Sequence, residues 1–408
     1  MTVFDPADPR WITTPGPLFD EIRETNPVHL APSNTWVVSQ HADALAVLRS
    51  RAASSDNLKA DPAHSPEGLR SDERRELARS NVANGVDARP FLFRDPPDHT
   101  RLRGLVQRAF TPRRVNELAP SITQLTDEIL DRHLGQGEFD AVAELAWAVP
   151  VRVIGEMLAI PEADHATFAA ASNGLAKGLD PDFMLSDEDA AARDAAVTHF
   201  ALYFHELFAQ RRRHPGEDLL SALIAARDGD DELSEMELLT TAILLLVAGH
   251  ETTTNLISGA LNLLGRDNVI QRDLRAHREW DRSATDEFMR LVSPVQLTGR
   301  TLLEDIELPS GHTLPAGWFT FVLIGAANRD PAVFDAPTEI RLTRDPNPQL
   351  GFGFGLHHCL GAPLARLETQ TVLRRVLDRS AQIEVTGSTT YRPNMILRGL
   401  ASLPLSLS

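Results

Sequence analysis

The sequence predicts a mainly α-helical protein with a few short strands. A helix expected over residues 234–264 would be about 45 Å long at ~1.5 Å per residue, long enough to cross the whole molecule. Glycine and proline punctuate residues 307–317 in a way that suits short strands and turns better than a helix. No low-complexity linker or internal repeat divides the chain. Length alone would suggest two or three domains at ~150 residues per domain, but no such linker marks a boundary between them.

The composition excludes several classes of protein. The chain carries 40 basic and 57 acidic residues, and its formal net charge of −17 argues against binding to nucleic acid or to an anionic membrane surface. The first residues lack the basic and apolar regions of a signal peptide, and no stretch approaches the ~20 apolar residues of a membrane span. A chain with one cysteine can form no internal disulfide, which fits a reducing cytosol. We expect a cytoplasmic protein with no membrane anchor and no nucleic-acid partner.

Short strands are expected near residues 35–39 and between residues 301 and 321. Between the first strand and residue 98, the stretch 51–98 is polar and broken by prolines and glycines, too irregular for core and too long for a simple connector. It predicts mobility or function. Its apolar end either faces a ligand or belongs to an ordinary surface loop, and consists of Phe91, Leu92 and Phe93.

A helix is expected from about residue 98 to residue 110. His99 and Arg103 are four residues apart and share one face of it, where two such donors could hold one carboxylate or could simply be solvated. The same stretch has no acidic residue between His99 and Glu117, and its further arginines are Arg101, Arg108, Arg113 and Arg114. A basic patch on an acidic protein predicts an acidic partner.

The helix over residues 234–264 opens with a capping box, in which Ser234 is followed by Glu237. Its middle carries a polar, weakened turn with the sequence Ala248-Gly249-His250-Glu251-Thr252. A glycine inside a helix costs ~1 kcal/mol relative to alanine, and threonine hydroxyls can bond the carbonyl four residues back and bend the helix. Apolar periodicity resumes at Leu256, so the helix does not simply emerge into solvent there. A locally unfavourable turn in a buried helix predicts function, and a carboxyl beside a hydroxyl suits proton transfer.

The loop over residues 352–361 holds the only cysteine, Cys359. Three glycines let its backbone take φ > 0 and let another group approach closely: Gly353, Gly355 and Gly361. A helix with Pro363 in its first turn is expected next, so Cys359 lies at a helix N-terminus, where the dipole favours a thiolate and lowers its pKa. This suits binding of a soft metal centre from one side. Read alone, Cys359 could also be a buried free thiol, or a hydrolytic nucleophile served by His357 and His358.

This loop resembles the haem-ligand loop of the cytochrome P450 family, Phe-Gly-x-Gly-x-His-x-Cys-x-Gly, at every fixed position. The resemblance implies the cytochrome P450 fold, with haem b (iron protoporphyrin IX) between the long central helix and the cysteine loop. It implies that residues 1–408 form a single domain, with a small β lobe largely from the N-terminal part and residues 301–321, and a large helical lobe elsewhere. It implies that the Cys359 thiolate binds the iron. The loop residues that it places around the cofactor are Phe352, Gly353, His357, Cys359 and Gly361.

Further motifs follow in the family order. His99 and Arg103 resemble the family's His-x-x-x-Arg, which binds a haem propionate, and Arg300 matches another propionate-binding arginine. The polar turn of the long helix resembles the family's oxygen-binding turn, in which the acid and the threonine deliver protons. The catalytic residues so implied are Ala248, Gly249, Glu251 and Thr252.

Glu287 and Arg290 match the family's Glu-x-x-Arg, which implies a structural ion-pair network. Arg344 is the better match for its third member, and Arg341 is the reserve. The chain departs from the family pattern at two positions, where isoleucine replaces a usual phenylalanine and glutamine a common histidine: Ile340 and Gln349. These departures leave the local assignment open.

The resemblance also places a substrate pocket and, over residues 169–198, mobile access helices. The residues expected to line the pocket are largely apolar and predict a lipophilic small molecule: Phe91, Leu92, Phe93, Leu244, Val247, Ala248, Val295, Gln296, Leu297 and Ile396.

Taken together, the resemblance implies a haem-thiolate monooxygenase that inserts one oxygen atom of O2 into a lipophilic small molecule by hydroxylation or epoxidation. No Gly-x-Gly-x-x-Gly turn follows a strand, so electrons must come from a separate protein, and we expect a ferredoxin-type partner with its ferredoxin reductase. Its docking face would consist of Arg101, Arg108, Arg113 and Arg114, bordered by Arg366, Arg374 and Arg375. We expect a monomer.

Two alternatives remain open. A haem-thiolate peroxygenase would use H2O2 directly, but its relatives lack the acid–threonine pair found here as Glu251 and Thr252. A non-catalytic haem or ligand-binding sensor would need neither a proton relay nor a surface for an electron donor.

Overall fold

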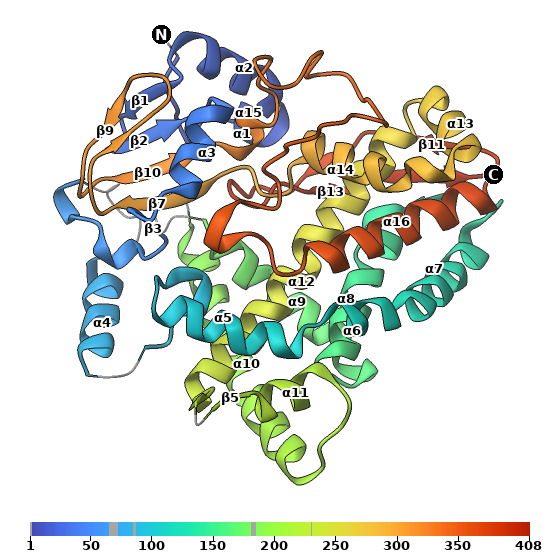
Figure 1. Cartoon of the computed structure of the whole chain (residues 1–408). Helices are drawn as coiled ribbons and strands as arrows, with labels where there is room; N and C mark the ends of the chain where they lie inside the picture. The colour runs from blue at the N-terminus through green and yellow to red at the C-terminus, as the bar shows by residue number, and fades with distance from the viewer. Residues whose placement is uncertain (1, 65–71, 85–86, 181–184, 230) are drawn as a thin grey trace.

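The computed structural model describes residues 2–64, 72–84, 87–180, 185–229 and 231–408. A lobe that contains the main sheet lies at the upper left of Figure 1, and a larger lobe of helices lies to its right and below. The mainly α fold with a small β lobe is confirmed.

The small lobe is built on a five-stranded sheet in the order β1-β2-β10-β7-β3. Its strands are β1 (Val28–Ala31), β2 (Thr35–Val38), β10 (Phe319–Val322), β7 (Thr298–Leu302) and β3 (Ala53–Ser54). Strand β10 pairs parallel to β2 and antiparallel to β7, so the sheet joins the N-terminal part of the chain to residues 298–322. A two-stranded extension follows β7, with β8 (Ile306–Glu307) and β9 (Thr313–Leu314). Both predicted strand regions are therefore confirmed.

Four short helices accompany this sheet: α1 (Arg10–Thr13), α2 (Pro15–Thr25), α3 (His41–Arg49) and α15 (Ile324–Ala327). Aromatic side chains fill the core of the lobe, where the rings of Phe4, Trp11 and Phe321 meet edge to face.

The stretch 51–98 is more regular than predicted. It contains β3, the 3-10 turns Asn57–Lys59, Pro62–His64 and Phe91–Phe93, and the helix α4 (Asp72–Ala83). Sequence reasoning missed α4 because its charged composition shows no apolar stripe. Residues 65–71 and 85–86, which include several of the glycines and prolines, lie outside the described residues.

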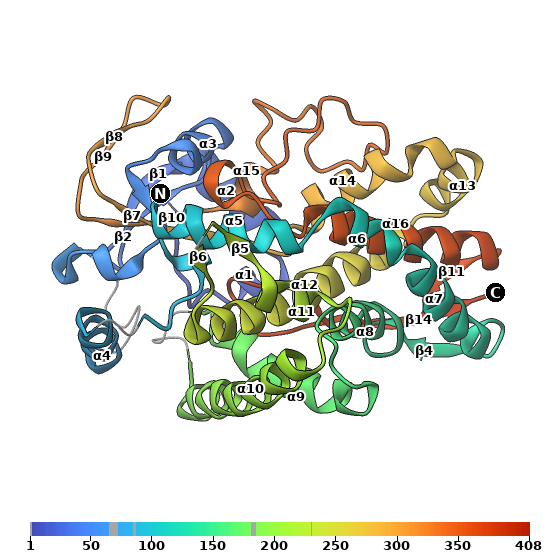
Figure 2. The same ribbon diagram turned by 60° about the horizontal axis from the view of Figure 1, so that its bottom comes forward.

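The helical lobe holds the remaining helices. They are α5 (Asp98–Ala109), α6 (Pro112–Glu117), α7 (Ala119–His133), α8 (Ala148–Met157), α9 (His165–Lys177), α10 (Asp187–Arg213), α11 (Leu219–Ala225), α12 (Glu235–Leu264), α13 (Asn268–Ala276), α14 (Asp281–Val292) and α16 (Ala362–Arg379). A π-helical turn over Val142–Ala146 precedes α8, 3-10 turns precede α9 (Glu162–Asp164) and α14 (Arg278–Trp280), and a small hairpin of β5 (Arg227–Asp228) and β6 (Asp231–Glu232) precedes α12. In the view of Figure 2, α9 and α10 lie side by side beneath α12.

Helix α12 is the axis of the lobe. The predicted capping box is present, since Ser234 Oγ accepts from the Glu237 N–H and the Glu237 carboxylate accepts from the Ser234 N–H. The helix packs against α8, α9, α14 and α16. A Cβ at Gly249 would lie 3.0 Å from Ile154 Cδ1, so glycine at this position lets α8 approach closely.

A second sheet, which the sequence did not predict, closes the helical lobe. Strand β14 (Pro404–Leu407) lies between β11 (Ile383–Val385) and β4 (Glu138–Asp140). A hairpin of β12 (Thr390–Tyr391) and β13 (Leu400–Ser402) presents the loop 392–399 toward α12. This approach is tight, because a Cβ at Gly399 would lie 1.8 Å from Asn255 Oδ1.

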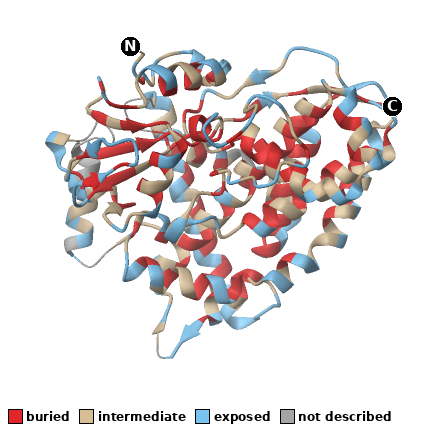
Figure 3. Cartoon of the chain, turned by 45° about the horizontal axis from the view of Figure 1, so that its top comes forward, coloured by how far each residue is buried: buried red, intermediate tan, exposed pale blue. Residues whose placement is uncertain are grey.

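Burial follows this architecture, with buried residues along the inner faces of the sheet and of the helices around α12 (Figure 3). Among the described residues, no helix combines the length and the apolar character needed to cross a membrane.

Candidate functional site

The cysteine loop is shaped by its glycines. The Cys359 N–H donates to Phe352 O at 2.8 Å, which closes the loop. Gly353 and Gly355 have φ of +68° and +69°, a region that other residues rarely adopt. At Gly355 a Cβ would also lie 2.9 Å from Leu48 O. The loop therefore packs against α3 in a backbone conformation that requires glycine at positions 353 and 355.

The Cys359 thiol lies at the start of α16, whose N-cap is Gly361. Cys359 is exposed, yet burial of its thiol is the largest influence and raises its pKa. The N–H groups of Gly361 and Ala362 and the charges of Arg103 and Arg366 act in the opposite direction. The predicted local causes of a lowered pKa are present, but the predicted net direction is wrong, because loss of solvation outweighs them.

Nitrogen-bearing side chains from three elements meet beside this loop. His99 on α5 is 1% exposed, and its ring centroid lies 4.2 Å from that of His357 in the loop. Both ring nitrogens of His99 and Nδ1 of His357 have no hydrogen-bond partner in the described part of the chain. Arg103 donates to His358 O at 2.6 Å. Arg300 on β7 is buried and donates to Gly299 O at 2.7 Å.

In the described part of the chain, no carboxylate forms a hydrogen bond with the side chains of this cluster. Burial lowers the pKa of Arg300 to about 10, with Asp95 opposing the shift. Burial, followed by the charge of Arg300 and the neighbouring His99, lowers the pKa of His357 to about 3. Asp95 is already engaged by Lys59, whose Nζ lies 2.6 Å from Oδ2. The cluster therefore suits a ligand that brings its own carboxylates.

The polar turn of α12 has one open face. Ala248 is exposed and Thr252 half-buried, although both lie in the middle of a buried helix. Thr252 Oγ1 donates to Ala248 O at 3.0 Å, so the predicted bond to the carbonyl four residues back is confirmed.

Glu251 has different surroundings from Thr252. It is 2% exposed, and Arg392 Nη1 donates to its Oε2 at 2.7 Å. His250 Nε2 lies 3.3 Å from its Oε1 and 2.8 Å from Ser172 Oγ on α9. Burial acts to raise the pKa of Glu251, but the neighbouring His250 and the pairing with Arg392 prevail and lower it.

Sequence reasoning missed this arrangement. His250 stands in the motif, but nothing in the spacing linked Glu251 to Arg392, which is 141 residues away, or His250 to Ser172. The one signal in the sequence was that Arg392 lies in a turn-rich segment. Many surface arginines lie in such segments, so this signal does not single out Arg392.

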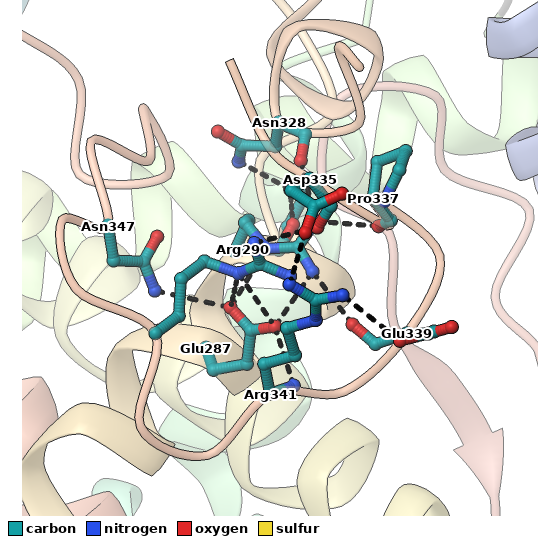
Figure 4. Close-up of polar contacts among 10 residues, drawn as sticks. Glu287, Arg290, Asn328, Asp335, Pro337, Glu339, Arg341 and Asn347 are labelled. Atoms are coloured by element: carbon teal, nitrogen blue, oxygen red, sulfur yellow. Dashed lines mark hydrogen bonds and ion pairs between the residues drawn. The ribbon is translucent and has the colours of Figure 1, made fainter. Parts of the chain in front are cut away.

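A buried ion-pair network joins α14 to the segment that precedes the cysteine loop (Figure 4). Glu287 and Arg290 on α14 are both 0% exposed, and Arg290 donates to Glu287 through Nε at 2.9 Å and Nη2 at 2.8 Å. Arg344 Nε lies 3.0 Å from Glu287 Oε2. Arg341 contributes its backbone N–H to Glu287, while its side chain pairs with Asp335. Arg344 therefore completes the network.

The two departures from the family pattern, at Ile340 and Gln349, do not prevent the ion-pair network from forming. Phe334 supplies an aromatic face, 5.1 Å from the guanidinium carbon of Arg290 and 5.8 Å from that of Arg344. Ile340 packs half-buried against the main core, and Gln349 Oε1 accepts from the Gly351 N–H.

Comparison with known proteins agrees with this geometry. The family model described as Cytochrome P450 matches residues 185–390. The polyketide biosynthesis cytochrome P450 PksS of Bacillus subtilis is 34% identical over 420 residues, which cover 100% of this chain and 99% of PksS. Its solved structure has a TM-score of 0.87 at 32% identity, over 100% of both chains. The chain belongs to the cytochrome P450 family.

Two further P450s are similar. Mycinamicin IV hydroxylase/epoxidase of Micromonospora griseorubida is 38% identical over 400 residues, covering 95% of this chain and 94% of that protein. The structure of P450BioI in complex with hexadec-9Z-enoic acid ligated acyl carrier protein has a TM-score of 0.87 at 31% identity, over 98% of this chain and 100% of that chain. This chain is thus an oxidoreductase of the P450 class, a haem-thiolate monooxygenase.

P450s bind haem b through a cysteine thiolate, and the residues of this chain fit that group. Cys359 is the only cysteine. The unpartnered ring nitrogens of His99 and His357 and the buried Arg300 offer donors for the two carboxylates of haem.

The predicted pocket residues are only partly brought together. Val247 of α12 is in one apolar cluster with the end of α9 and the loop 392–399, whose members include Ala176, Val295, Ile396 and Leu397. Leu244 and Phe93 are half-buried and Leu92 is exposed.

Three predicted pocket residues differ from expectation. Leu297 is 0% exposed and packs in the core of the small lobe, and Phe91 belongs to the core of the helical lobe. Gln296 is buried, with its amide donating to Val292 O at 3.3 Å. Of the expected access segment, residues 181–184 lie outside the described residues; α9 and α10 flank them.

The arginines of the predicted docking face already have partners within the chain. Arg101 pairs with Asp231 and Glu237, Arg108 with Asp228 and Arg113 with Glu117, while Arg114 donates to Glu217 O. On the proximal side the pairs are Arg366–Asp286, Arg374–Asp281 and Arg375–Asp127. The absence of acids between residues 99 and 117 was misleading, because the fold brings carboxylates from β5, β6 and the first turn of α12.

Proposed function

We propose that this P450 inserts one oxygen atom of O2 into a lipophilic small molecule, with electrons from a separate ferredoxin-type protein and its reductase. The observation that carries the substrate class is the apolar cluster where α9, α12 and the loop 392–399 meet, beside the open face of Ala248 and Thr252.

In this proposal Cys359 binds the haem iron, and the thiolate-bound haem supplies the oxygen-activating chemistry. His99, Arg103, Arg300 and His357 hold the haem carboxylates by charge-assisted hydrogen bonds. The loop residues Phe352, Gly353 and Gly361 shape the proximal wall. The unpartnered nitrogens described above support this assignment.

Thr252 and Glu251 serve proton delivery. Thr252 uses its hydroxyl hydrogen on Ala248 O, so its oxygen is left to accept a hydrogen bond from a water or a reacting group. The Glu251 carboxyl is the proton-exchanging group behind it. Gly249 contributes by letting α8 pack against the turn, which keeps the helix in register at Ala248 and Thr252.

The names of the relatives support a lipophilic substrate. One belongs to polyketide biosynthesis, and another was solved with a fatty-acid-ligated acyl carrier protein. A hydroxylase/epoxidase among them supports both outcomes for this chain, an alcohol or an epoxide.

The partner assignment is also part of the proposal. A ferredoxin would dock near α5 and α6, where Arg113 is largely exposed, and on the side of α16 near the cysteine loop. Because most arginines there are paired, steering by charge would be weaker than unpaired arginines would provide. We also propose that the protein is a monomer, consists of a single domain and is located in the cytoplasm.

The test is a binding screen by the spin-state shift of the ferric protein, with fatty acids, steroids, terpenoids and polyketides. Compounds that bind are then tested for product with O2, a ferredoxin and its reductase. Tight binding confined to small, highly charged compounds would contradict the apolar pocket. Equal turnover with H2O2 alone would favour a peroxygenase, and binding without O2 consumption would favour a sensor.

A further inference from the structure

The loop 392–399 is tied to the end of α9 by a buried carboxylate. Asp180 is buried, and its Oδ2 accepts from the Met395 N–H at 3.0 Å while its Oδ1 accepts from the Ile396 N–H at 2.9 Å. Lys177 donates to Asp180 Oδ2 at 3.0 Å and to Pro393 O at 2.6 Å. Two residues of α9 and its C-terminal extension therefore hold three residues of the loop.

The other side of the loop is held by the backbone. The Gln296 N–H donates to Ile396 O, and the Arg398 N–H donates to Pro294 O, both at 2.9 Å. The position of the loop is thus determined jointly by α9 and by the segment after α14.

Arg392 stands at the start of this loop. Its backbone N–H donates to Gly399 O at 3.0 Å, and its guanidinium reaches Glu251 on α12. Its side chain keeps some contact with solvent, whereas the carboxylate it holds is almost fully buried. Because Gly399 touches Asn255, the loop has little freedom to move along α12.

We infer that Arg392 is a positioning residue that holds the Glu251 carboxyl group for proton delivery, and that Asp180 fixes the loop that carries Arg392. This inference rests on the proposed role of Glu251. Asp180 at the end of α9 holds the loop backbone at Met395, and Arg392 at the start of the same loop holds Glu251 on α12, so the loop connects the two contacts.

The charges around Glu251 explain why positioning is needed. His250 and Arg392 are the charged or titratable partners that the structure records for it. Without Arg392 the buried carboxylate would keep an uncompensated charge, and it would take up a proton or turn toward His250. Either change would remove the proton-exchanging group from its place behind Thr252.

The same contacts link the pocket to the proton path. Ala176 of α9 packs in the apolar cluster with Val247 and Leu397, one helical turn before Asp180. A ligand that displaces α9 would therefore disturb the Asp180 contacts first and the Arg392–Glu251 pair second.

The first test compares Arg392→Gln with Arg392→Lys. The measurement is the fraction of reducing equivalents that ends in product and not in peroxide. We expect this fraction to fall severalfold in Arg392→Gln and to return in part in Arg392→Lys, which keeps the charge. Substrate affinity by spin-state titration should change less than twofold, and the thiolate-type ferrous–carbonyl band should persist.

The second test uses Asp180→Asn, read out by hydrogen–deuterium exchange. We expect the amides of Met395 and Ile396 to exchange at least tenfold faster, whatever the activity. Product coupling should fall as in Arg392→Gln, and the double variant should be no worse than either single variant, because both act through one path. Additive losses, or faster exchange with unchanged coupling, would overturn the part assigned to Asp180.

Arg398→Gln is the matched control. Arg398 lies on the same loop, but its side chain donates to Ile12 O and stacks 4.0 Å above the ring of Tyr391. Because its side chain does not contact Glu251 or Asp180, Arg398→Gln should leave the Arg392–Glu251 pair and product coupling unchanged. Glu251→Gln distinguishes the proposed role of Glu251 from the role inferred for Arg392. Unchanged turnover in Glu251→Gln would overturn the role of Glu251 and this inference together. Slow turnover in Glu251→Gln with normal coupling in Arg392→Gln would overturn this inference alone.

Discussion

The imidazole rings of His99 and His357 lie 4.2 Å apart between centroids, and no carboxylate among the described residues is hydrogen-bonded to either ring. Helix α5 and the cysteine loop bring them together, and Arg300 of β7 completes the group. Like charges and unsatisfied donors are costly when buried. Haem carboxylates would relieve that cost.

Arg300→Met should therefore accelerate haem loss. A hydrogen bond to a charged group contributes about 1.5–3 kcal/mol, so transfer of haem to excess apomyoglobin should be on the order of tenfold to hundredfold faster. Arg101→Met is the control, because Arg101 is paired with Asp231 away from the cluster. Equal transfer rates for the wild type and Arg300→Met would remove Arg300 from the cofactor site.

Cys359→Ser should abolish the red-shifted ferrous–carbonyl Soret band, since the chain has one cysteine and only a thiolate produces that band. His358→Ala, at the neighbouring exposed position, should keep it. Persistence of the band in the serine variant would show that the iron ligand lies elsewhere.

Thr252→Ala should divert reducing equivalents to peroxide while substrate affinity changes less than twofold. The hydroxyl lies on the open face of α12, so its loss removes a hydrogen-bonding oxygen and little packing. Thr252→Ser should largely restore coupling. Thr240→Ala, on the same helix with its hydroxyl bonded to Glu237 O, should be silent. Product yield in Thr252→Ala equal to that of the wild type would contradict the role.

Glu287→Gln should destabilise the fold strongly at neutral pH. Removing one charge of a buried pair typically costs about 3–5 kcal/mol, and here both Arg290 and Arg344 would lose their partner. The measurement is urea unfolding at pH 7, with Glu279→Gln, an exposed ion-pair partner of His277, as a nearly silent control.

The ion-pair network of Glu287 also determines how the stability difference between the wild type and Glu287→Gln depends on pH. Burial acts to raise the pKa of Glu287, but its hydrogen bond from Arg290 leads the opposing causes and the pKa is lowered from 4.5. The stability it contributes is present above pH 4.5 and is lost as pH falls through the lower folded pKa. The gap between wild type and Glu287→Gln should therefore shrink below pH 4.5. A gap that stays constant down to the folded pKa would contradict this assignment.

Arg108→Glu with Arg113→Glu should slow ferredoxin-supported turnover by about threefold to tenfold at low salt, through slower association, and less at high salt. The effect is modest because both arginines are already paired. Substrate binding should be unchanged. Arg152→Glu on α8, also an exposed ion-paired arginine, is the control. Identical kinetics for the double variant and Arg152→Glu at low salt would place the partner elsewhere.

Local spacing accounts for what the sequence could predict. His99 with Arg103, Glu287 with Arg290, and Ser234 with Glu237 each lie three or four residues apart, and that spacing places them on one turn of a helix. The long helix α12 and the cysteine loop were predictable for the same reason, because their signals are contiguous in the chain.

Contacts between distant segments could not be predicted. The partner of Glu251 is carried by a hairpin with strands of two and three residues, too short to give a periodic signal. The carboxylates that neutralise Arg101 come from β6 and α12, and the burial of Leu297 depends on aromatic packing in the small lobe. Each of these depends on tertiary placement, which no spacing along the chain encodes.

The central position of β14 has a consequence for biosynthesis. A ribosome produces residues 404–407 after every other described element, yet this strand fills the middle of the sheet between β11 and β4. Until it emerges, two strand edges have no partner and the sites for Leu403, Leu405 and Leu407, all fully buried in the native fold, stand open. Unpaired edges beside apolar surface are templates for aggregation. The nascent chain therefore exposes these strand edges and apolar sites until β14 inserts, and chaperones that bind apolar segments would act in that interval.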